Sequence, residues 1–267
     1  MMDIRNLTNE NRKIIQQQGC FSVLSYLRDA SVNAMNAERE YFMDKMDVRR
    51  RQVMISLNGN NAVTVQAGAM QWMAGNVEVK TGVQSVGDFL GKMVKSSLTQ
   101  ETAVKPVYYG AGIVMLEPTY KHILLQDVAS WGPQGMTIED GMFLACDSTV
   151  QHNIVARSNF SSAVAGGEGL FNLSLRGNGV VALESNVPQS ELIEVSLDNS
   201  VLKIDGRYAV CWSTSLQFTV ERTTKTLIGS AASGEGLVNV YRGTGKVLLA
   251  PVTPSYSMAA ATNSVSR

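Results

Sequence analysis

Apolar and polar residues alternate along much of the chain, and this pattern indicates β-strands. The segments "FNLSLRG" from Phe171 and "LQFTVER" from Leu216 alternate with a period of two, which is typical of strands with one buried face. Further extended runs read "RQVMISL", "HILLQDV" and "ELIEVSL". The pattern therefore predicts an all-β fold.

Two glycine signatures recur in three consecutive segments. A single glycine stands at a strand start in each, at Gly68, Gly141 and Gly206. A Gly-x-Gly motif leads into a later strand at Gly110 and Gly112, Gly177 and Gly179, and Gly243 and Gly245. Glycine adopts the positive φ of tight turns, so the single glycines predict turns and Gly-x-Gly predicts a hairpin between two strands.

These signatures divide the chain. An N-terminal extension covers residues 1–50, a single domain of three repeats covers 51–254 (51–118, 119–185 and 186–254), and a loose tail covers 255–267. In the extension, "FSVLSYL" predicts a strand and "NAMNAEREYFMDKMD" a helix. We expect three tandem antiparallel β repeats to close into a pseudo-threefold barrel or prism, because closure hides sheet edges.

An insertion in the first repeat has helical spacing. Its apolar residues are Val83, Val86, Phe89, Leu90, Met93 and Val94. This spacing predicts a short helix that lies over a barrel end or a sheet. Docking to a protein partner or to a membrane surface is the alternative.

A glutamate recurs at equal intervals, at Glu101, Glu168 and Glu235. Each precedes a β run, so the first interpretation is a carboxylate that bonds backbone donors at a strand start. If the three instead meet at the pseudo-threefold axis, they would share protons or bind a small molecule or cation. They are candidate ligand residues on that second hypothesis.

The sequence offers little for catalysis. The two histidines, His122 and His152, form no metal-binding pair, and no metal or other cofactor is expected. By spacing, Cys146 and Cys211 share one repeat position with Met73, which indicates core packing and no nucleophile. No catalytic residue is assigned, and we expect a protein that is not an enzyme.

Charge bears on partners and compartment. Acidic and basic residues balance at 23 each, and the basic pieces at Arg49–Arg51, Arg207, Arg222 and Lys225 are scattered, so no nucleic acid is expected. Charged residues make up only 17%, which hints that some surface is covered by copies of the chain. Unpaired cysteines and a polar N-terminus indicate a cytoplasmic protein, with at most peripheral membrane contact.

The "AGAMQWMAGNVEVKTG" run, the "GEGLF…GNG" block and the "GTGKVLLAP" ending resemble the altered-inheritance-of-mitochondria family over Gln52–Pro251. This resemblance implies a fold like that of the tryptophan RNA-binding attenuation protein, within the double-stranded β-helix class, with an unassigned function. Mitochondrial members are associated with inner-membrane organisation. The chain shows no transit peptide, so that role is not carried over.

Together these observations favour a non-enzymatic binding or scaffold protein that assembles with itself as a homo-oligomer and has a protein partner. Small-molecule or ion binding at the axis is the alternative. RNA binding, which the fold relatives bring up, ranks below both.

Overall fold

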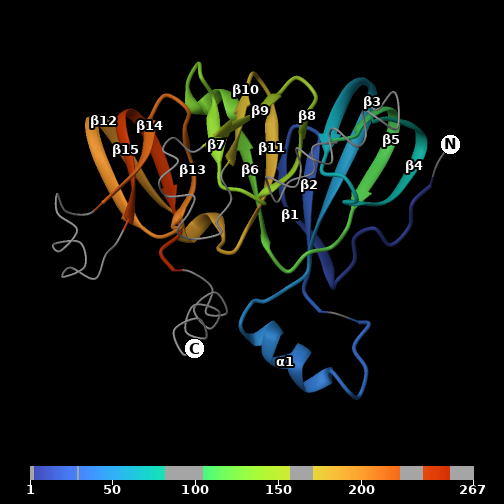
Figure 1. Ribbon diagram of the computed structural model, residues 1–267. Coiled ribbons are helices and arrows are strands. Elements are labelled where there is room, and N and C mark those ends of the chain that lie inside the picture. Colours follow the sequence, from blue (N-terminus) through green and yellow to red (C-terminus); the bar gives the residue numbers. More distant parts are fainter. Residues whose placement is uncertain (1–2, 29, 82–104, 157–170, 223–236, 253–267) are drawn as a thin grey trace, which may run out of the picture.

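The computed structural model describes residues 3–28, 30–81, 105–156, 171–222 and 237–252 (Figure 1). Strands dominate these residues, with one α-helix, α1 (Ala37–Lys45), and two short 3-10 helices, Val128–Trp131 and Gln189–Glu191. The all-β prediction is therefore confirmed. The predicted tail at 255–267 lies outside the described residues.

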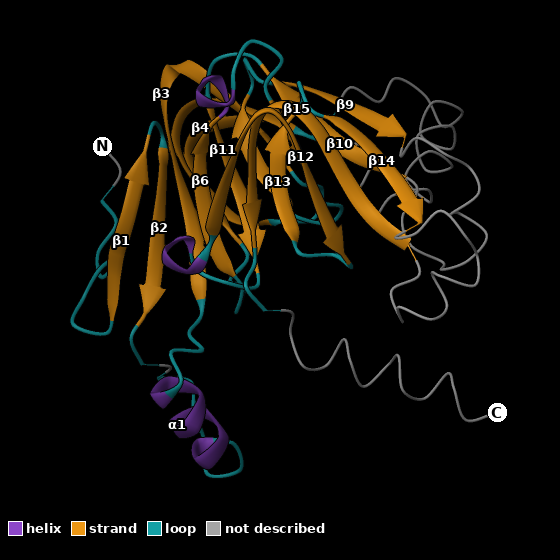
Figure 2. Cartoon of the chain, turned by 90° about the vertical axis from the view of Figure 1, so that its left-hand side faces the viewer, coloured by secondary structure: helices purple, strands orange, loops and turns teal. Residues whose placement is uncertain are grey.

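The N-terminal extension contributes to the β body. Strands β1 (Arg12–Gln18) and β2 (Phe21–Tyr26) form a hairpin, and β2 pairs with β3 (Arg51–Val65) through Phe21 and Ile55. The strand and the helix predicted for this region are both present. Helix α1 lies away from the sheets in both views (Figures 1 and 2), and none of its residues is buried.

Each of the three segments uses the same pairing scheme, in which the last strands lie between the first and the middle ones. In the first segment, β5 lies between β3 and β4. In the second, β11 lies between β6 and β8, and β10 lies between β7 and β9. In the third, β15 pairs with β12 along one edge and with β13 and β14 along the other. The bounds are β4 Met70–Lys80, β5 Val107–Leu116, β6 His122–Asp127, β7 Met136–Ile138, β8 Phe143–Asp147, β9 Gln151–Ala156, β10 Phe171–Arg176, β11 Val180–Ser185, β12 Ile193–Asp205, β13 Ala209–Ser213, β14 Gln217–Arg222 and β15 Leu237–Leu249.

The segments join into an eight-stranded and a seven-stranded sheet. Pairing of β3 with β8 links the first segment to the second, and pairing of β7 with β13 links the second to the third. Within the described ranges, no pairing joins the third segment back to the first, and β12 and β4 lie at opposite ends in Figure 1. Closure about a pseudo-threefold axis stays a prediction.

Gly68 and Gly141 lie in turns, as predicted, and Gly206 lies in a bend. Gly68, Gly141 and Gly206 have φ angles of 82°, 78° and 76°, which side-chain-bearing residues rarely adopt. Each lies just before the middle strand of its segment, so the same backbone conformation starts β4, β8 and β13.

The hairpin prediction for Gly-x-Gly is wrong. Gly110 and Gly112 lie inside the continuous strand β5, and Gly243 and Gly245 lie inside β15. Gly177 and Gly179 separate β10 from β11, which lie in different sheets and do not pair with each other. The motif lets the strand bend from one half of the segment to the other without reversing direction. Glycine supplies the positive φ that such a bend needs, and a hairpin turn needs it too.

Among the described residues there are four apolar cores: three follow each other along the chain, and a smaller one holds Leu24, Met54 and Met115. The first contains Ala145 and Ala182 of the second segment, and the second contains Cys211 and Leu248 of the third. Each of these two cores is therefore completed by the segment that follows. The buried residues of the third core, which include Trp212, all come from the third segment.

Candidate functional site

The candidate ligand and helix residues lie outside the described part of the chain. They are Glu101, Glu168 and Glu235, and Val83, Val86, Phe89, Leu90, Met93 and Val94. Their roles stay predictions, and the site must be sought in the described residues.

Two junctions join the three segments at equivalent strand positions. At the first, Thr64 of β3 lies opposite Cys146 of β8; at the second, Thr137 of β7 lies opposite Trp212 of β13. All four residues are at least 95% buried. Each junction therefore places a threonine against an apolar side chain within a continuous sheet.

Strand pairing corrects one equivalence that spacing had predicted. Cys146 lies opposite Val181, which is two residues beyond a Gly-x-Gly motif. In the third segment the residue two beyond the motif is Val247, and Trp212 lies opposite it, so Trp212 is the counterpart of Cys146. Cys211 is offset by one because the third segment has one more residue between its glycine turn and its strand. Both cysteines are buried, as core packing requires, but Met73 is 43% exposed.

The strands that would form a third junction, β4 and β12, lie at the two ends of the molecule, and each has one edge without a partner among the described strands. Met73 of β4 lies opposite Val114 and therefore corresponds to Cys146, but across the outer edge of β4 no described strand pairs with it. At the other end, Lys203 of β12 is exposed and Val201 is 49% exposed. These two edges are one candidate site.

A hollow of about 380 Å³ beside the first junction is the second candidate. It lies between the turns at Gly68 and Gly141, and Pro118, Phe143 and Leu144 contribute apolar walls. This volume is within the range of small-molecule pockets, which is roughly 300–1,000 Å³.

Two carboxylates line the hollow, and lysines contact two of its lining residues, Glu184 and Phe143. Glu117 and Glu184 both line it, and Glu184 accepts a hydrogen bond from Lys121 at 2.8 Å. Lys105 Nζ lies 4.3 Å from the ring centroid of Phe143, on the edge of the site. Glu117 is exposed and offers its carboxylate to an incoming group.

The second junction carries an ion pair beside the equivalent strand positions. The N–H of Gln66 donates to Leu144 at the first junction, and the N–H of Glu139 donates to Val210 at the second, so Gln66 and Glu139 correspond. Arg207, the additional residue after Gly206, donates from Nε to Glu139 at 3.0 Å. A guanidinium therefore binds the second-junction counterpart of Gln66, a residue that lines the hollow at the first junction.

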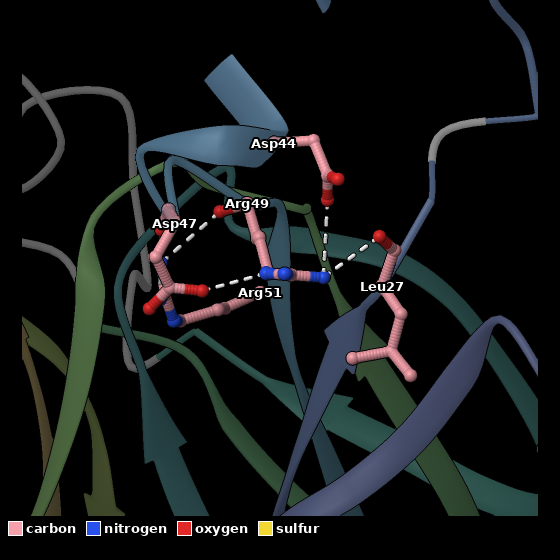
Figure 3. A network of polar contacts seen from close by, with 5 residues as sticks. All are labelled: Leu27, Asp44, Asp47, Arg49 and Arg51. Carbon is pink, nitrogen blue, oxygen red and sulfur yellow. Dashed lines mark hydrogen bonds and ion pairs between the residues drawn. The ribbon is translucent and has the colours of Figure 1, made fainter. Parts of the chain in front are cut away.

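The run Arg49–Arg51 is used for internal contacts below the sheet. Arg49 binds Asp44 at 3.2 Å and Asp47 at 2.6 Å, and donates to the carbonyl oxygen of Leu27 at 2.7 Å (Figure 3). Burial lowers the pKa of Arg51, whose Nη2 lies 3.6 Å from Asp47. These contacts connect α1 to β2 and β3, which was not predicted from the sequence.

The thiols and imidazoles lie in environments that oppose their charged forms. Burial, followed by Asp147, raises the pKa of Cys20 to about 12, and burial raises the pKa of Cys211. Burial also lowers the pKa of His122 and His152. In the described ranges, no cluster of three or more His, Cys, Asp or Glu residues could hold a metal ion.

Helix α1 and its flanks expose apolar side chains. The most exposed are Met35, Met46, Tyr41 and Phe42, and the two aromatic rings contact each other edge to face at 5.6 Å. None of the helices in the described residues has the length and apolar character that a membrane crossing requires.

Comparisons with known proteins identify a family but no activity. The family model described as Mitochondrial biogenesis AIM24 matches residues 46–252. An uncharacterized protein of Streptococcus pyogenes serotype M6, M6_Spy0233, is 28% identical over 205 residues, which is 74% of this chain and 79% of that protein. A crystal structure of a Streptococcus pyogenes protein, SPYM3_0169, shares the fold with a TM-score of 0.58 and 24% identity, over 80% of this chain and 93% of that one.

Proposed function

The chain belongs to the Mitochondrial biogenesis AIM24 family, and on this premise we propose that it is a non-enzymatic scaffold that acts by associating with copies of itself. The observation that carries this proposal is that, among the described strands, β4 pairs only with β5 and β12 only with β15, which leaves one edge of each unpaired. Unpaired edges offer free N–H and C=O groups to another chain. Met73 and Val201 add exposed apolar surface on the two edge strands.

Light scattering coupled to size-exclusion chromatography tests this proposal. We expect the mass to rise with protein concentration, and the double variant Met73→Lys with Val201→Lys to lower it, because both positions are exposed and edge lysines oppose pairing. Val252→Lys, at a position 61% exposed outside the strands, is the control. The mass of a single chain at every concentration would contradict self-association.

Support for a non-enzymatic role comes from the described ionisable groups. Cys20 and Cys211 have raised pKa values and therefore form thiolates, the nucleophilic species, only at high pH. All three cysteines are free, which agrees with a reducing compartment, and we propose that the protein acts in the cytoplasm.

A second candidate function is the binding of a small organic cation in the hollow beside the first junction. Arg207 at the second junction favours this chemistry, because its guanidinium binds Glu139, the counterpart of Gln66 in the wall of the hollow. Apolar walls from Phe143 and Leu144 suit an alkyl chain, and Glu117 suits an ammonium or guanidinium head.

Calorimetric titration with butylguanidine is the test for the second candidate. We expect binding that is lost in Glu117→Gln and absent for the neutral isostere butylurea. Equal heats for both compounds, or unchanged binding in Glu117→Gln, would remove this candidate and leave the scaffold proposal untouched.

A further inference from the structure

We infer that copies of this chain join head to tail, with β12 of one copy pairing antiparallel with β4 of the next. In this register Lys203 lies opposite Met73, Leu202 opposite Ala74 and Ile204 opposite Trp72. The inference rests on the proposed self-association and adds to it the two edges, their direction and their register.

The register follows from the two junctions within one chain. On the first side of each junction, Thr64 pairs with Val107 and Thr137 pairs with Ser174, and both partners lie three residues before a Gly-x-Gly motif. Lys203 pairs with Val240, which lies three residues before the third motif. Lys203 is therefore the third-segment counterpart of the two junction threonines.

The other side of each junction is fixed in the same way. Cys146 and Trp212 lie opposite Val181 and Val247, each two residues beyond a motif, and Met73 lies opposite Val114 at the same distance. Within the chain, Thr64 pairs with Cys146 and Thr137 with Trp212. The missing third combination is Lys203 with Met73.

The two edges differ from each other, and this determines the form of the assembly. Edge β4 lies at one end of the molecule and edge β12 at the other (Figure 1). A contact between unlike surfaces leaves one of each free after every addition, so it produces a ring if it closes and a chain of copies if it does not. A two-fold dimer through identical edges is a different outcome.

The side chains indicate a contact that is weaker than the inner junctions. Met73 is partly exposed and becomes covered, as Cys146 and Trp212 are. Lys203 replaces the buried threonine, and a lysine on an edge strand opposes pairing until its ammonium reaches solvent along its alkyl stem. Assembly is therefore reversible and depends on concentration.

Restoring the junction threonine gives a direct test of the register. Lys203→Thr creates the residue found at both inner junctions, so we expect association roughly two- to fivefold tighter by sedimentation, the size of a favourable cross-strand pair. Lys203→Glu is the matched substitution, which keeps a charge at the edge and gives no such gain. Weaker association of Lys203→Thr than of the parent would overturn the register.

Cross-linking between two single-cysteine variants tests the direction. Met73→Cys and Lys203→Cys are mixed and treated with a short bis-maleimide, and we expect a cross-linked dimer in the mixture and none in either variant alone. Val79→Cys with Lys203→Cys is the control, because Val79 lies about 20 Å further along β4 at roughly 3.3 Å per residue. The parent protein, with buried Cys146 and Cys211 and half-buried Cys20, shows the background.

The outcomes separate this inference from the scaffold proposal. Cross-links within the Met73→Cys variant alone would show identical edges meeting and would overturn the head-to-tail arrangement while association stands. Association by light scattering without the mixed cross-link would do the same. A single-chain mass at every concentration would overturn both.

Discussion

The inner junctions and the outer ends of this molecule use equivalent strand positions but carry different side chains. Thr64 and Thr137 are buried at the inner junctions, whereas their counterpart Lys203 is exposed at the outer end. Strands paired on both edges can bury a threonine, whereas an unpaired edge benefits from a charge that opposes indiscriminate pairing. The residue at this one position, threonine or lysine, therefore distinguishes the paired from the unpaired edge. The alternation of apolar and polar residues along the strand does not make that distinction.

The cores differ in the same way as the edges. The first two cores are completed by the following segment, but the third closes on itself with aromatic rings. The ring of Trp212 stacks on Phe218 at 5.6 Å and meets Tyr241 edge to face at 5.2 Å. Large rings supply packing in the third core, whereas residues of the following segment complete the first two.

The largest expected effect on stability follows from removing the ring of Trp212. We expect Trp212→Ala to lower the free energy of unfolding by about 3–5 kcal/mol, the usual cost of truncating a buried tryptophan. Cys146→Ala, at the equivalent inner position, should cost about 1 kcal/mol, close to the average for point substitutions. Urea unfolding followed by circular dichroism measures both.

Equal losses in these two variants would break the comparison, because they would mean that the third core does not depend on its rings. Phe218→Leu, which keeps an apolar side chain beside Trp212, should lie between the two. This variant separates loss of volume from loss of ring contacts.

Substitutions of the first glycine in each Gly-x-Gly motif should have a graded effect along the molecule. Gly110, Gly177 and Gly243 have φ angles of 106°, 118° and 120°, so alanine is strained at all three. A Cβ at Gly110 would collide with the carbonyl oxygen of Asn76, and at Gly177 it would lie 2.8 Å from that of Thr149. At Gly243 the nearest atom would be 3.8 Å away.

We therefore expect losses of about 3 kcal/mol for Gly110→Ala, about 2 for Gly177→Ala and about 1 for Gly243→Ala, within the range for strained backbone. Thermal unfolding gives the order. A cost for Gly243→Ala as large as that for Gly110→Ala would mean that φ strain alone decides and that close approach of the strands contributes nothing.

Much of this fold could be predicted from the sequence. Alternation predicted the strands, and the turns at Gly68 and Gly141 followed from spacing. Whether the chain reverses at Gly-x-Gly could not be predicted, because a hairpin and a bend within a strand need the same positive φ.

The candidate sites could be predicted less well, because they depend on pairing between distant segments. The additional residue Arg207 shifts Cys211 by one position, which spacing alone does not reveal. The hollow and the exposed edges depend on which strands lack a neighbour, and no local pattern encodes that. Only strand pairing makes Lys203 the counterpart of Thr64 and Thr137, because each threonine lies four residues before its turn glycine whereas Lys203 lies three residues before Gly206.

Arg207→Gly sharpens the comparison of the two junctions. It removes the ion pair with Glu139, so the turn before β13 then lacks a guanidinium, as the turn before β8 does. The pair is partly exposed, so we expect a loss below about 1 kcal/mol and a fall of roughly 2–4 °C or less in Tm. A double-mutant cycle with Glu139→Gln measures the coupling, and a coupling of zero would mean that Arg207 only fills space.

The smallest expected effect concerns acid stability at the outer end. Glu221 of β14 binds Arg242 of β15 through two contacts, at 2.5 and 2.8 Å, and accepts a hydrogen bond from Thr219. The bonds from Arg242 and Thr219 lower the pKa of Glu221 from 4.5 to about 2. Because the folded pKa lies below the unfolded one, this pair stabilises the fold above pH 4.5, and the contribution is lost as pH falls toward 2.

Glu221→Gln should therefore be slightly less stable than the parent at neutral pH and should lose less stability on acidification. The pair lies at the surface, where solvent screens it, so the difference between the two proteins stays small. Thermal unfolding at neutral pH and at successively lower pH values measures this convergence, with the exposed carboxylate variant Glu38→Gln as the control. Parallel pH curves for the parent and Glu221→Gln would mean that the outer end draws no stability from this pair, and that the third segment is held by its aromatic core alone.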